Sequence, residues 1–204
     1  MKYVSYTHNG RATYGHVEGD TVSDLGAIPG APADLVAALK ASALAGLKAP
    51  ATLPLADIKL LPVVTNPAKI FCVGHNYESH RVETGRAKVG HPSIFLRFAD
   101  TLNADSAEVL RPKSSISLDY EAELAIIIGK GGRYISEADA MSHVAGFTCA
   151  NDVSVRDWQW HTTQFAPGKN FPTTCPLGPW MVTPDEIDDL NAVSVTSRLN
   201  GQVM

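Results

Sequence analysis

Alternating apolar and polar residues predict a small antiparallel meander near the start of the chain, over Tyr3–Leu25. Asn9 and Gly10 both tolerate positive φ and are a strong hairpin signal, and Glu18–Asp20 supplies a second turn. The Ala- and Leu-rich segment Pro32–Leu47 opens with Pro and Asp and predicts a helix. The proline-rich stretch that follows has little periodicity, so we expect it to connect this small unit to the main domain.

The rest of the chain consists mainly of short apolar runs that are typical of strands. Strands are expected over Ala68–Gly74, Pro92–Phe98, Ser117–Lys130, Gly146–Ala150, Gly178–Thr183 and Val193–Leu199. Glu78–Gly85 predicts a short helix that ends at its glycine, and a Ser-x-x-Asp pattern at Ser136 favours another. We predict an α+β fold of mixed or antiparallel sheet, with a small N-terminal domain and linker (residues 1–66) and a main domain (residues 67–204).

Composition narrows the classes of partner. The formal net charge of −4 argues against nucleic acid or an anionic membrane surface. No apolar run approaches the roughly 20 residues of a membrane span, and Met1–Gly10 lacks the apolar core of a signal peptide. Three cysteines without a C-x-x-C pattern (Cys72, Cys149 and Cys175) are typical of free thiols in a reducing cytoplasm, so we expect a cytoplasmic protein. Cys72 and Cys149 lie in apolar runs and are expected to stay protonated.

Two acidic residues stand at the start of an apolar run. Glu121 and Glu123 lie two apart, so a strand places both carboxylates on one face, and the run Leu124–Ile128 predicts burial of that strand on both faces. Carboxylates about 4 Å apart repel by about 4 kcal/mol at an effective dielectric constant of about 20. A proton, an Arg or Lys side chain, or a divalent cation would relieve this repulsion, as would a solvated strand end.

A third acidic residue favours the divalent cation. Asp152 ends the predicted strand Gly146–Ala150, and ends of strands often carry functional side chains. Three carboxylates without thiol or imidazole would select Mg²⁺, Mn²⁺ or Ca²⁺. Asp119, which shares the strand parity of Glu121, and Asp157 compete for the same role.

A histidine and a glutamate form a second candidate group. His80 and Glu83 are three residues apart and face each other on the predicted helix. Glu83 could orient the imidazole and raise its basicity, as in a general-base pair, although a surface ion pair has the same spacing. His75 is a further polar candidate near this turn.

Downstream polar residues could bind a substrate. Lys169 lies in a Gly- and Pro-rich loop, and Arg156 and Gln159 are three apart on an expected helical turn. These side chains are natural ligands for the oxygens of a keto acid. Each could equally be a solvated surface residue.

Four segments together resemble the fumarylacetoacetate hydrolase family. They are KIFCVGHNYESHRVETG, SLDYEAELAIIIGK, NDVSVRDWQ and GKNF…CPLGPWMVT, in the family's order between Lys69 and Thr183. The resemblance implies a mixed β-roll or sandwich catalytic fold with a small N-terminal domain, usually as a homodimer. It is closer to the smaller, microbial type, because the metal-binding Asp of the animal enzymes is replaced here by Val73.

The resemblance also implies roles for the candidate residues. It implies Mg²⁺ (or Mn²⁺, with Ca²⁺ possible) on Glu121, Glu123 and Asp152, with Asp119 only a neighbour. It implies a catalytic pair on a mobile lid, His80 and Glu83, and Lys169 as the ligand of a substrate oxyanion. The substrate contacts that it implies are Arg156, Gln159, His75 and Tyr77.

The expected function follows from this resemblance. We expect a Mg²⁺-dependent hydrolase that cleaves a C–C bond in acylpyruvate-type (1,3-diketo acid) substrates, in a catabolic pathway. An isomerase or decarboxylase of related diacids could use the same site. The Asn200-Gly201 hairpin signal leaves only three residues for a returning strand, and the family's Gly-Thr-Pro loop is missing. We therefore expect the native chain to continue past Met204, and an inactive binding module is the remaining alternative.

Overall fold

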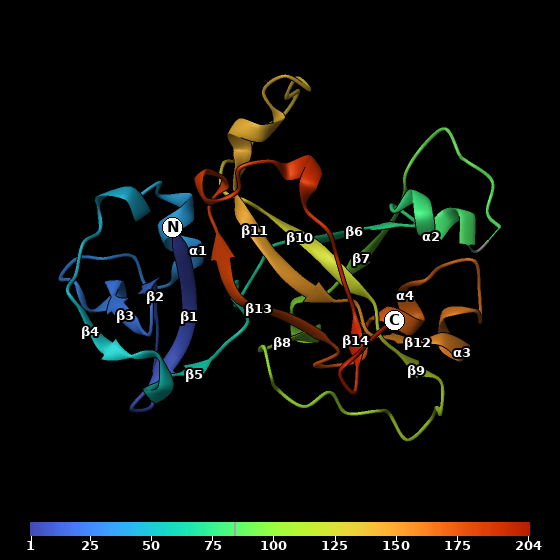
Figure 1. Cartoon of the computed structure of the whole chain (residues 1–204), viewed down its shortest axis with the longest axis horizontal. Helices are drawn as coiled ribbons and strands as arrows, with labels where there is room; N and C mark the ends of the chain where they lie inside the picture. The colour runs from blue at the N-terminus through green and yellow to red at the C-terminus, as the bar shows by residue number, and fades with distance from the viewer. Residues whose placement is uncertain (84) are drawn as a thin grey trace.

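The computed structural model describes residues 1–83 and 85–204, and strands dominate it (Figure 1). Its first three strands are β1 (Lys2–His8), β2 (Arg11–Glu18) and β3 (Thr21–Asp24), paired antiparallel in chain order. Asn9 and Gly10 turn between β1 and β2 with φ of 50° and 78°. The predicted meander and its Asn-Gly turn are therefore confirmed.

The predicted helix over Pro32–Leu47 is shorter than expected. Helix α1 spans Leu35–Lys40, because the carboxylate of Asp34 caps it by accepting the backbone N–H of Ala37 at 2.7 Å. Ser42 then takes φ of 52°, a left-handed conformation that stops the helix. The segment expected as a connection holds two strands, β4 (Ala51–Pro54) and β5 (Lys59–Leu60).

One nine-stranded sheet runs through most of the molecule. Seven strands follow the order β10-β11-β13-β1-β2-β3-β4, with β10 over Ala122–Ile128, β11 over Val144–Asn151 and β13 over Cys175–Val182. The other two strands lie off this path: β5 pairs with β1, and β8 pairs with β13. β1 pairs antiparallel with β13, so the N-terminal meander and the later strands share hydrogen bonds (Figure 1). The division at residues 66 and 67 stays a prediction.

Smaller pairs of strands complete the fold. β6 (Ile70–Gly74) pairs with β7 (Ser93–Arg97), and β9 (Leu118–Asp119) pairs with β12 (Ser154–Val155). β8 (Leu102–Asn103) runs parallel to β13. Around Asn200-Gly201, β14 (Arg198–Leu199) pairs with β15 (Gln202–Val203), so this hairpin forms although the strand expected over Val193–Leu199 is mostly irregular.

The remaining helices are short. They are α2 (Glu78–Glu83), α3 (Arg156–Gln159) and α4 (Ala166–Lys169). Single 3-10 turns span Leu25–Ala27, Leu44–Gly46, Leu55–Asp57, Ala99–Thr101, Ala140–His143, Pro184–Glu186 and Leu190–Ala192. Gly85, just after α2, has φ of 65°, as its expected role at the end of that helix requires. The described residues form no helix with the length and apolar character needed to cross a membrane.

The expectation of strands buried on both faces is wrong. On β10, Ile126 and Ile128 are 55% and 61% exposed, whereas Ile127 between them is 8% exposed. Side chains alternate between the two faces of a strand, so Ile127 points to the covered face of β10, whereas Ile126 and Ile128 point to a face that the described residues leave largely open. Phe71 and Val73 on β6 are likewise exposed, so one face of this strand is also uncovered.

The core joins the meander to the later strands. Its main cluster contains residues from both parts of the chain: Tyr3, Tyr14, Leu25, Leu35, Ala38, Val63, Ile127 and Met181. A second cluster packs Val4, Tyr6, Val17 and Val22. Gly146 on β11 lets the main cluster close, because a Cβ there would lie 2.6 Å from Met181 Cγ and would also overlap the carbonyl oxygen of Val182.

We predict that Gly146→Ala lowers the free energy of unfolding by about 1–3 kcal/mol, the usual cost of overpacking. The obstacle is the backbone of β13, which cannot rotate away as a flexible side chain could. Gly131→Ala is the matched control, since a Cβ at Gly131 has nothing within 4 Å. Urea denaturation measures both, and equal stabilities of the two variants would contradict the prediction.

Candidate active site

A buried lysine lies between two carboxylates. Lys169 Nζ is 2.6 Å from Glu121 Oε2 and 2.8 Å from Asp152 Oδ2, and its side chain is 3% exposed. Glu121 precedes β10, Asp152 follows β11, and Lys169 ends α4. The structure thus brings together three of the residues that the sequence singled out.

A glycine next to this lysine allows the close packing. A Cβ at Gly168 would lie 2.5 Å from Gln159 N and 2.6 Å from the carbonyl oxygen of Val155. Glycine therefore permits α4 to lie directly against α3 and the end of β12. This contact carries Lys169 into the interior beside the two carboxylates.

An arginine that the sequence analysis did not single out holds the other side of Asp152. Arg97 Nε donates to Asp152 Oδ1 at 2.5 Å and Arg97 Nη2 donates to the carbonyl oxygen of Val153 at 2.6 Å. The side chain of Arg97 is fully buried. The available signal was a charged residue inside the apolar strand Pro92–Phe98, because a buried charge requires a partner.

Arg156 holds the free side of Glu121. Arg156 Nη2 lies 2.6 Å from Glu121 Oε1 and 2.6 Å from Asp119 Oδ2, and Arg156 Nη1 donates to Gln159 Oε1 at 2.8 Å. The two predicted substrate ligands, Arg156 and Gln159, therefore lie together next to the carboxylates. Asp119 pairs with Arg156, in a position beside the site.

Glu123 is the carboxylate of the site whose negative charge is least compensated by cationic neighbours. It is half-buried, and burial raises its pKa, with the charges of Glu121 and Asp152 adding to the effect. The Tyr77 hydroxyl and the charge of Lys169 oppose that shift in pKa without cancelling it. Within residues 1–83 and 85–204, no ion pair of Glu123 is formed.

Asp152 shows the opposite behaviour. Burial disfavours its charged form, but the charges of Arg97 and Lys169 and their hydrogen bonds outweigh burial and lower its pKa. The pKa of Glu123 is thus raised, mainly by burial, whereas the pKa of Asp152 is lowered by its paired cations.

The His–Glu pair lies on α2 at the surface. His80 Nδ1 is 3.5 Å from Glu83 Oε2, and the two side chains are 54% and 79% exposed. The ring of His75 stacks on that of His80 with centroids 6.4 Å apart and meets Phe165 edge-on. Burial and the charge of Arg86 lower the pKa of His75. The predicted pair is therefore close enough to interact, with His75 beside it.

The thiols do not contribute an ionised nucleophile to this cluster. Burial, with the charge of Asp152 adding, raises the pKa of Cys72 to about 12, so this thiol stays protonated as expected. Burial also raises the pKa of Cys175. Cys149 is exposed, although it lies in an apolar run of the sequence.

The three carboxylates of the site offer the kind of ligand atoms that a hard divalent cation prefers. Glu121, Glu123 and Asp152 offer only oxygen atoms, and Glu123 is a partly buried carboxylate whose pKa its neighbours raise. Among the described residues, however, no three His, Cys, Asp or Glu side chains converge as a ligand set. Lys169 Nζ stands between two of the three carboxylates instead. These residues could hold a cation after a shift of side chains around Lys169.

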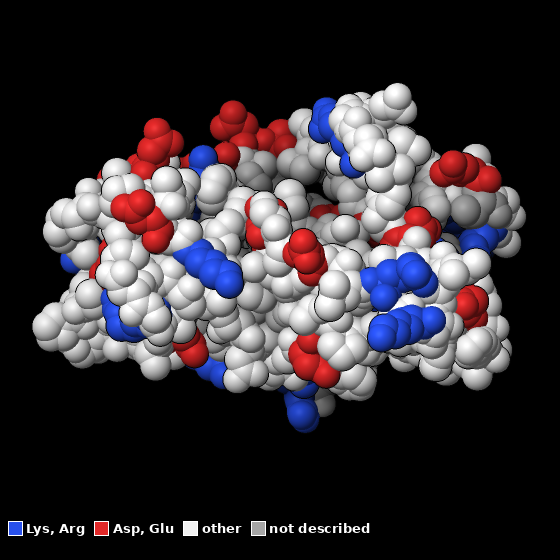
Figure 2. Space-filling view, turned by 90° about the horizontal axis from the view of Figure 1, so that it is seen from below, with Lys and Arg blue, Asp and Glu red and all other residues white. Residues whose placement is uncertain are grey.

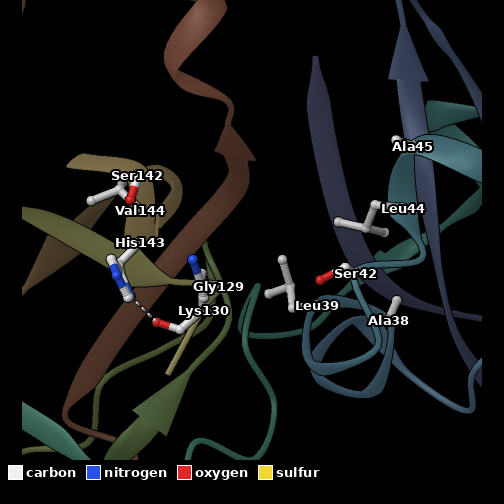
Figure 3. A pocket seen from close by; sticks show the side chains of 10 residues that line it. All are labelled: Ala38, Leu39, Ser42, Leu44, Ala45, Gly129, Lys130, Ser142, His143 and Val144. Atoms are coloured by element: carbon white, nitrogen blue, oxygen red, sulfur yellow. Dashed lines mark hydrogen bonds between the residues drawn. The ribbon is translucent and has the colours of Figure 1, made fainter. Parts of the chain in front are cut away.

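The surface elsewhere is of mixed charge. Figure 2 shows acidic and basic side chains interspersed over the face seen there. A hollow of about 280 Å³ lies away from the carboxylates, between α1 with the turn that follows it and the turn joining β10 to β11 (Figure 3). His143 Nδ1 is bonded to the carbonyl oxygen of Lys130 at 2.8 Å on its wall. This hollow is separate from the candidate active site.

A buried lysine among carboxylates, together with a His–Glu pair elsewhere on a strand-rich α+β fold, is characteristic of an enzyme rather than of a purely structural module. The family described as "Fumarylacetoacetate (FAA) hydrolase C-terminal" matches residues 69–204. The chain belongs to this family, and the resemblance inferred from its four segments is confirmed.

Curated relatives include enzymes with different names. Oxaloacetate tautomerase FAHD2A, mitochondrial, from Homo sapiens is 44% identical over 154 residues, which cover 74% of this chain and 49% of that protein. The 2,4-didehydro-3-deoxy-L-rhamnonate hydrolase of Sphingomonas sp. (strain SKA58) is 34% identical over 207 residues, which cover 100% of this chain and 71% of that protein. The chain spans about half the length of the tautomerases that it matches.

Solved structures share the fold. A fumarylacetoacetate hydrolase from Exiguobacterium antarcticum superposes with a TM-score of 0.81 at 30% identity, covering 100% of this chain and 73% of that one. A maleylpyruvate hydrolase from Sphingobium sp. SYK-6, in complex with manganese (II) ion and pyruvate, gives a TM-score of 0.69 at 29% identity, covering 93% and 69%. The predicted α+β fold of the fumarylacetoacetase type is confirmed.

We predict opposite effects on stability for two carboxylates of the site. Asp152→Asn removes the negative charge that Arg97 and Lys169 share, and both cations stay buried. The change should lower the free energy of unfolding by about 3–5 kcal/mol at neutral pH. Glu123→Gln removes a charge that burial and like charges disfavour, so the metal-free protein should keep or gain stability.

The pH dependence distinguishes the two effects. The pKa of Asp152 is lowered by folding, so its contribution is present above the pKa of the unfolded chain and is lost as the pH falls through the folded value. The difference in free energy of unfolding between wild type and Asp152→Asn, measured by urea denaturation, should therefore become smaller in acid. A loss of stability in Glu123→Gln as large as that in Asp152→Asn would refute this assignment.

Proposed function

We propose that the protein is a divalent-metal-dependent enzyme that hydrolyses a C–C bond in acylpyruvate-type substrates, in a catabolic role. One observation carries the proposal, the Lys169 ammonium held between Glu121 and Asp152 in the interior. A buried cation of this kind is suited to stabilise an oxyanion that develops during reaction, because it is already desolvated and fixed in place.

Lys169 retains the capacity to bind a substrate oxygen. An ammonium group has three N–H donors, of which Glu121 and Asp152 accept two. The third can donate to the enolate oxygen of a 2-oxo acid. Arg156 and Gln159, which lie next to Glu121, are placed to bind the substrate's carboxylate and keto oxygens.

The charge of the cluster supports binding of a divalent cation and then of an anion. Three cationic side chains oppose four carboxylates, leaving one excess negative charge; these are Arg97, Arg156 and Lys169 with Asp119, Glu121, Glu123 and Asp152. A divalent cation on Glu121, Glu123 and Asp152 would reverse that sign and supply Lewis-acid polarisation of the keto oxygen. We propose Mg²⁺, with Mn²⁺ or Ca²⁺ as alternatives, and the manganese and pyruvate in the Sphingobium structure support a divalent cation at such a site.

His80 and Glu83 are proposed to activate water. Glu83 lies within reach of His80 Nδ1 and can hold the tautomer in which the other ring nitrogen accepts a proton. Both side chains are exposed, so water has access to them. A hydroxide formed there would attack the carbonyl carbon distal to the pyruvate part, the C–C bond would break, and Lys169 would receive the enolate.

A second candidate function shares the same residues. The 44% identity to proteins named oxaloacetate tautomerase favours keto–enol exchange of an oxaloacetate-like diacid. Related isomerases and decarboxylases would also need the enolate to be stabilised, whereas only hydrolysis requires an activated water. A non-catalytic binding module remains the third alternative, and failure to bind a metal would favour it.

We predict that the metal-loaded protein releases pyruvate from acylpyruvates and that His80→Ala lowers kcat about a hundredfold or more, the usual size of a general-base effect. His91→Ala, which changes an exposed histidine outside α2, is the control. Pyruvate release coupled to its enzymatic reduction follows the reaction, and calorimetric titration should show Mn²⁺ affinity unchanged in His80→Ala.

The substrate panel separates the candidates. No cleavage of acylpyruvates by wild type, together with rapid interconversion of enol and keto oxaloacetate, would replace the hydrolase by the tautomerase. Full hydrolytic activity in His80→Ala would refute the role of the His–Glu pair.

Self-association is proposed from an exposed apolar surface. Five residues on one face of the β6–β7 pair are each more than 40% exposed: Phe71, Val73, Ile94, Leu96 and Phe98. Phe71 lies opposite Leu96, and Val73 lies opposite Ile94, so these side chains form one continuous patch. A homodimer that covers this patch is the simplest arrangement.

We predict that Phe71→Asp shifts sedimentation-equilibrium mass from dimer toward monomer, because a carboxylate in an apolar interface would be desolvated without a partner. Ile116→Asp is the control at an apolar residue that is 90% exposed outside the patch. A monomeric wild type, or an unchanged mass in Phe71→Asp, would contradict the proposed interface.

A further inference from the structure

One tyrosine connects the helix of the His–Glu pair to the strand of the carboxylates. The carbonyl oxygen of Tyr77 accepts the backbone N–H of Arg81, so Tyr77 begins the hydrogen bonding of α2. Its hydroxyl, at the other end of the side chain, accepts the backbone N–H of Leu124 on β10 at 3.2 Å. A single residue therefore joins two elements that carry different parts of the proposed machinery.

The same hydroxyl keeps a proton to donate. Having accepted the N–H of Leu124, it can still donate to a carboxylate. Glu123 is the residue before Leu124, and its charge acts on Tyr77, whose pKa is raised mainly by burial. The bond to Leu124 therefore anchors Tyr77 beside one carboxylate of the proposed metal site.

Helix α2 has few apolar contacts that could hold it in place. None of its residues is buried, and Arg81 bonds locally, to Glu78 and to the carbonyl oxygen of Arg86. Short helices are marginal by themselves and depend on contacts with the rest of the protein. The contact of Tyr77 with β10 is therefore well placed to decide where His80 and Glu83 lie.

We propose that Tyr77 is a positioning residue that couples α2 to the carboxylate site, so that binding of a divalent cation near Glu123 orders the helix that carries His80 and Glu83. This inference rests on the proposed metal site. It gives Tyr77 a different role from the substrate contact that the family resemblance implies, because its hydroxyl accepts the backbone N–H of Leu124. Groups that hold metal ligands in position commonly contribute 10–100-fold to metal affinity.

Two measurements on Tyr77→Phe test the coupling. The first is Mn²⁺ affinity from the electron paramagnetic resonance signal of the free ion. The second is the rate of trypsin cleavage at Arg81 and Arg86, with and without Mn²⁺. We expect affinity to fall about tenfold or more. We expect Mn²⁺ to slow cleavage in wild type and to have no effect on cleavage in Tyr77→Phe.

Two further variants complete the design. Tyr134→Phe, at a tyrosine that is 94% exposed, should behave as wild type in both measurements. Glu123→Gln keeps an acceptor for the Tyr77 hydroxyl, so cleavage without Mn²⁺ should match wild type while the protection by Mn²⁺ is lost. This variant also tests the coupling if Tyr77→Phe does not fold.

The outcomes separate the two proposals. Wild type that binds no Mn²⁺ would overturn the proposed metal-dependent function itself. Wild type that binds Mn²⁺, with Tyr77→Phe showing equal affinity or equal protection of α2, would overturn the role of Tyr77 and leave the proposed function standing.

Discussion

The pairing of Lys169 with Glu121 and Asp152 is the constraint on which the site depends. An ammonium that is almost fully removed from water is tolerated only if carboxylates replace its hydration. The requirement brings together the start of β10, the end of β11 and α4, which are far apart in the sequence. Arg97 then becomes necessary as well, because Asp152 in the interior has a second oxygen to satisfy. The catalytic chemistry and the local packing therefore have one electrostatic origin.

Most of the fold could be predicted where local physics decides it. The Asn9-Gly10 turn, the meander and the end of α2 near Gly85 follow from backbone preferences that neighbours cannot easily override. The wrong predictions concern the burial of strand side chains, which depends on distant parts of the molecule. The isoleucines of β10 have the composition of a strand buried on both faces, but only the packing of other elements against the sheet determines which of them are covered. The pairing of β1 with β13 was likewise not accessible from periodicity.

For the site, residue type and spacing identified the carboxylates, Lys169, Arg156 and the His80–Glu83 pair, and the structure gathers the carboxylates with Lys169 and Arg156. Arg97 was missed because an arginine in an apolar strand has no partner visible in its own segment. The bond of the Tyr77 side chain was missed for a related reason. Its partner, the backbone N–H of Leu124, lies 47 positions later, and hydrogen bonds to a backbone N–H leave no mark on the residue types involved.

The shared sheet has a consequence for how the chain folds. Lys2 of β1 pairs with Val182 of β13, whereas Tyr6 and Thr7 pair with β5, so the start of β1 stays unpaired on this edge until β13 reaches it. The strand pairing within the meander is local and can form early, whereas closing so long a loop delays the strands that carry the site. During synthesis on the ribosome, the start of β1 is exposed until residue 182 has emerged. That interval is when a chaperone would have most reason to bind, and when a second nascent chain could pair with β1 in place of β13.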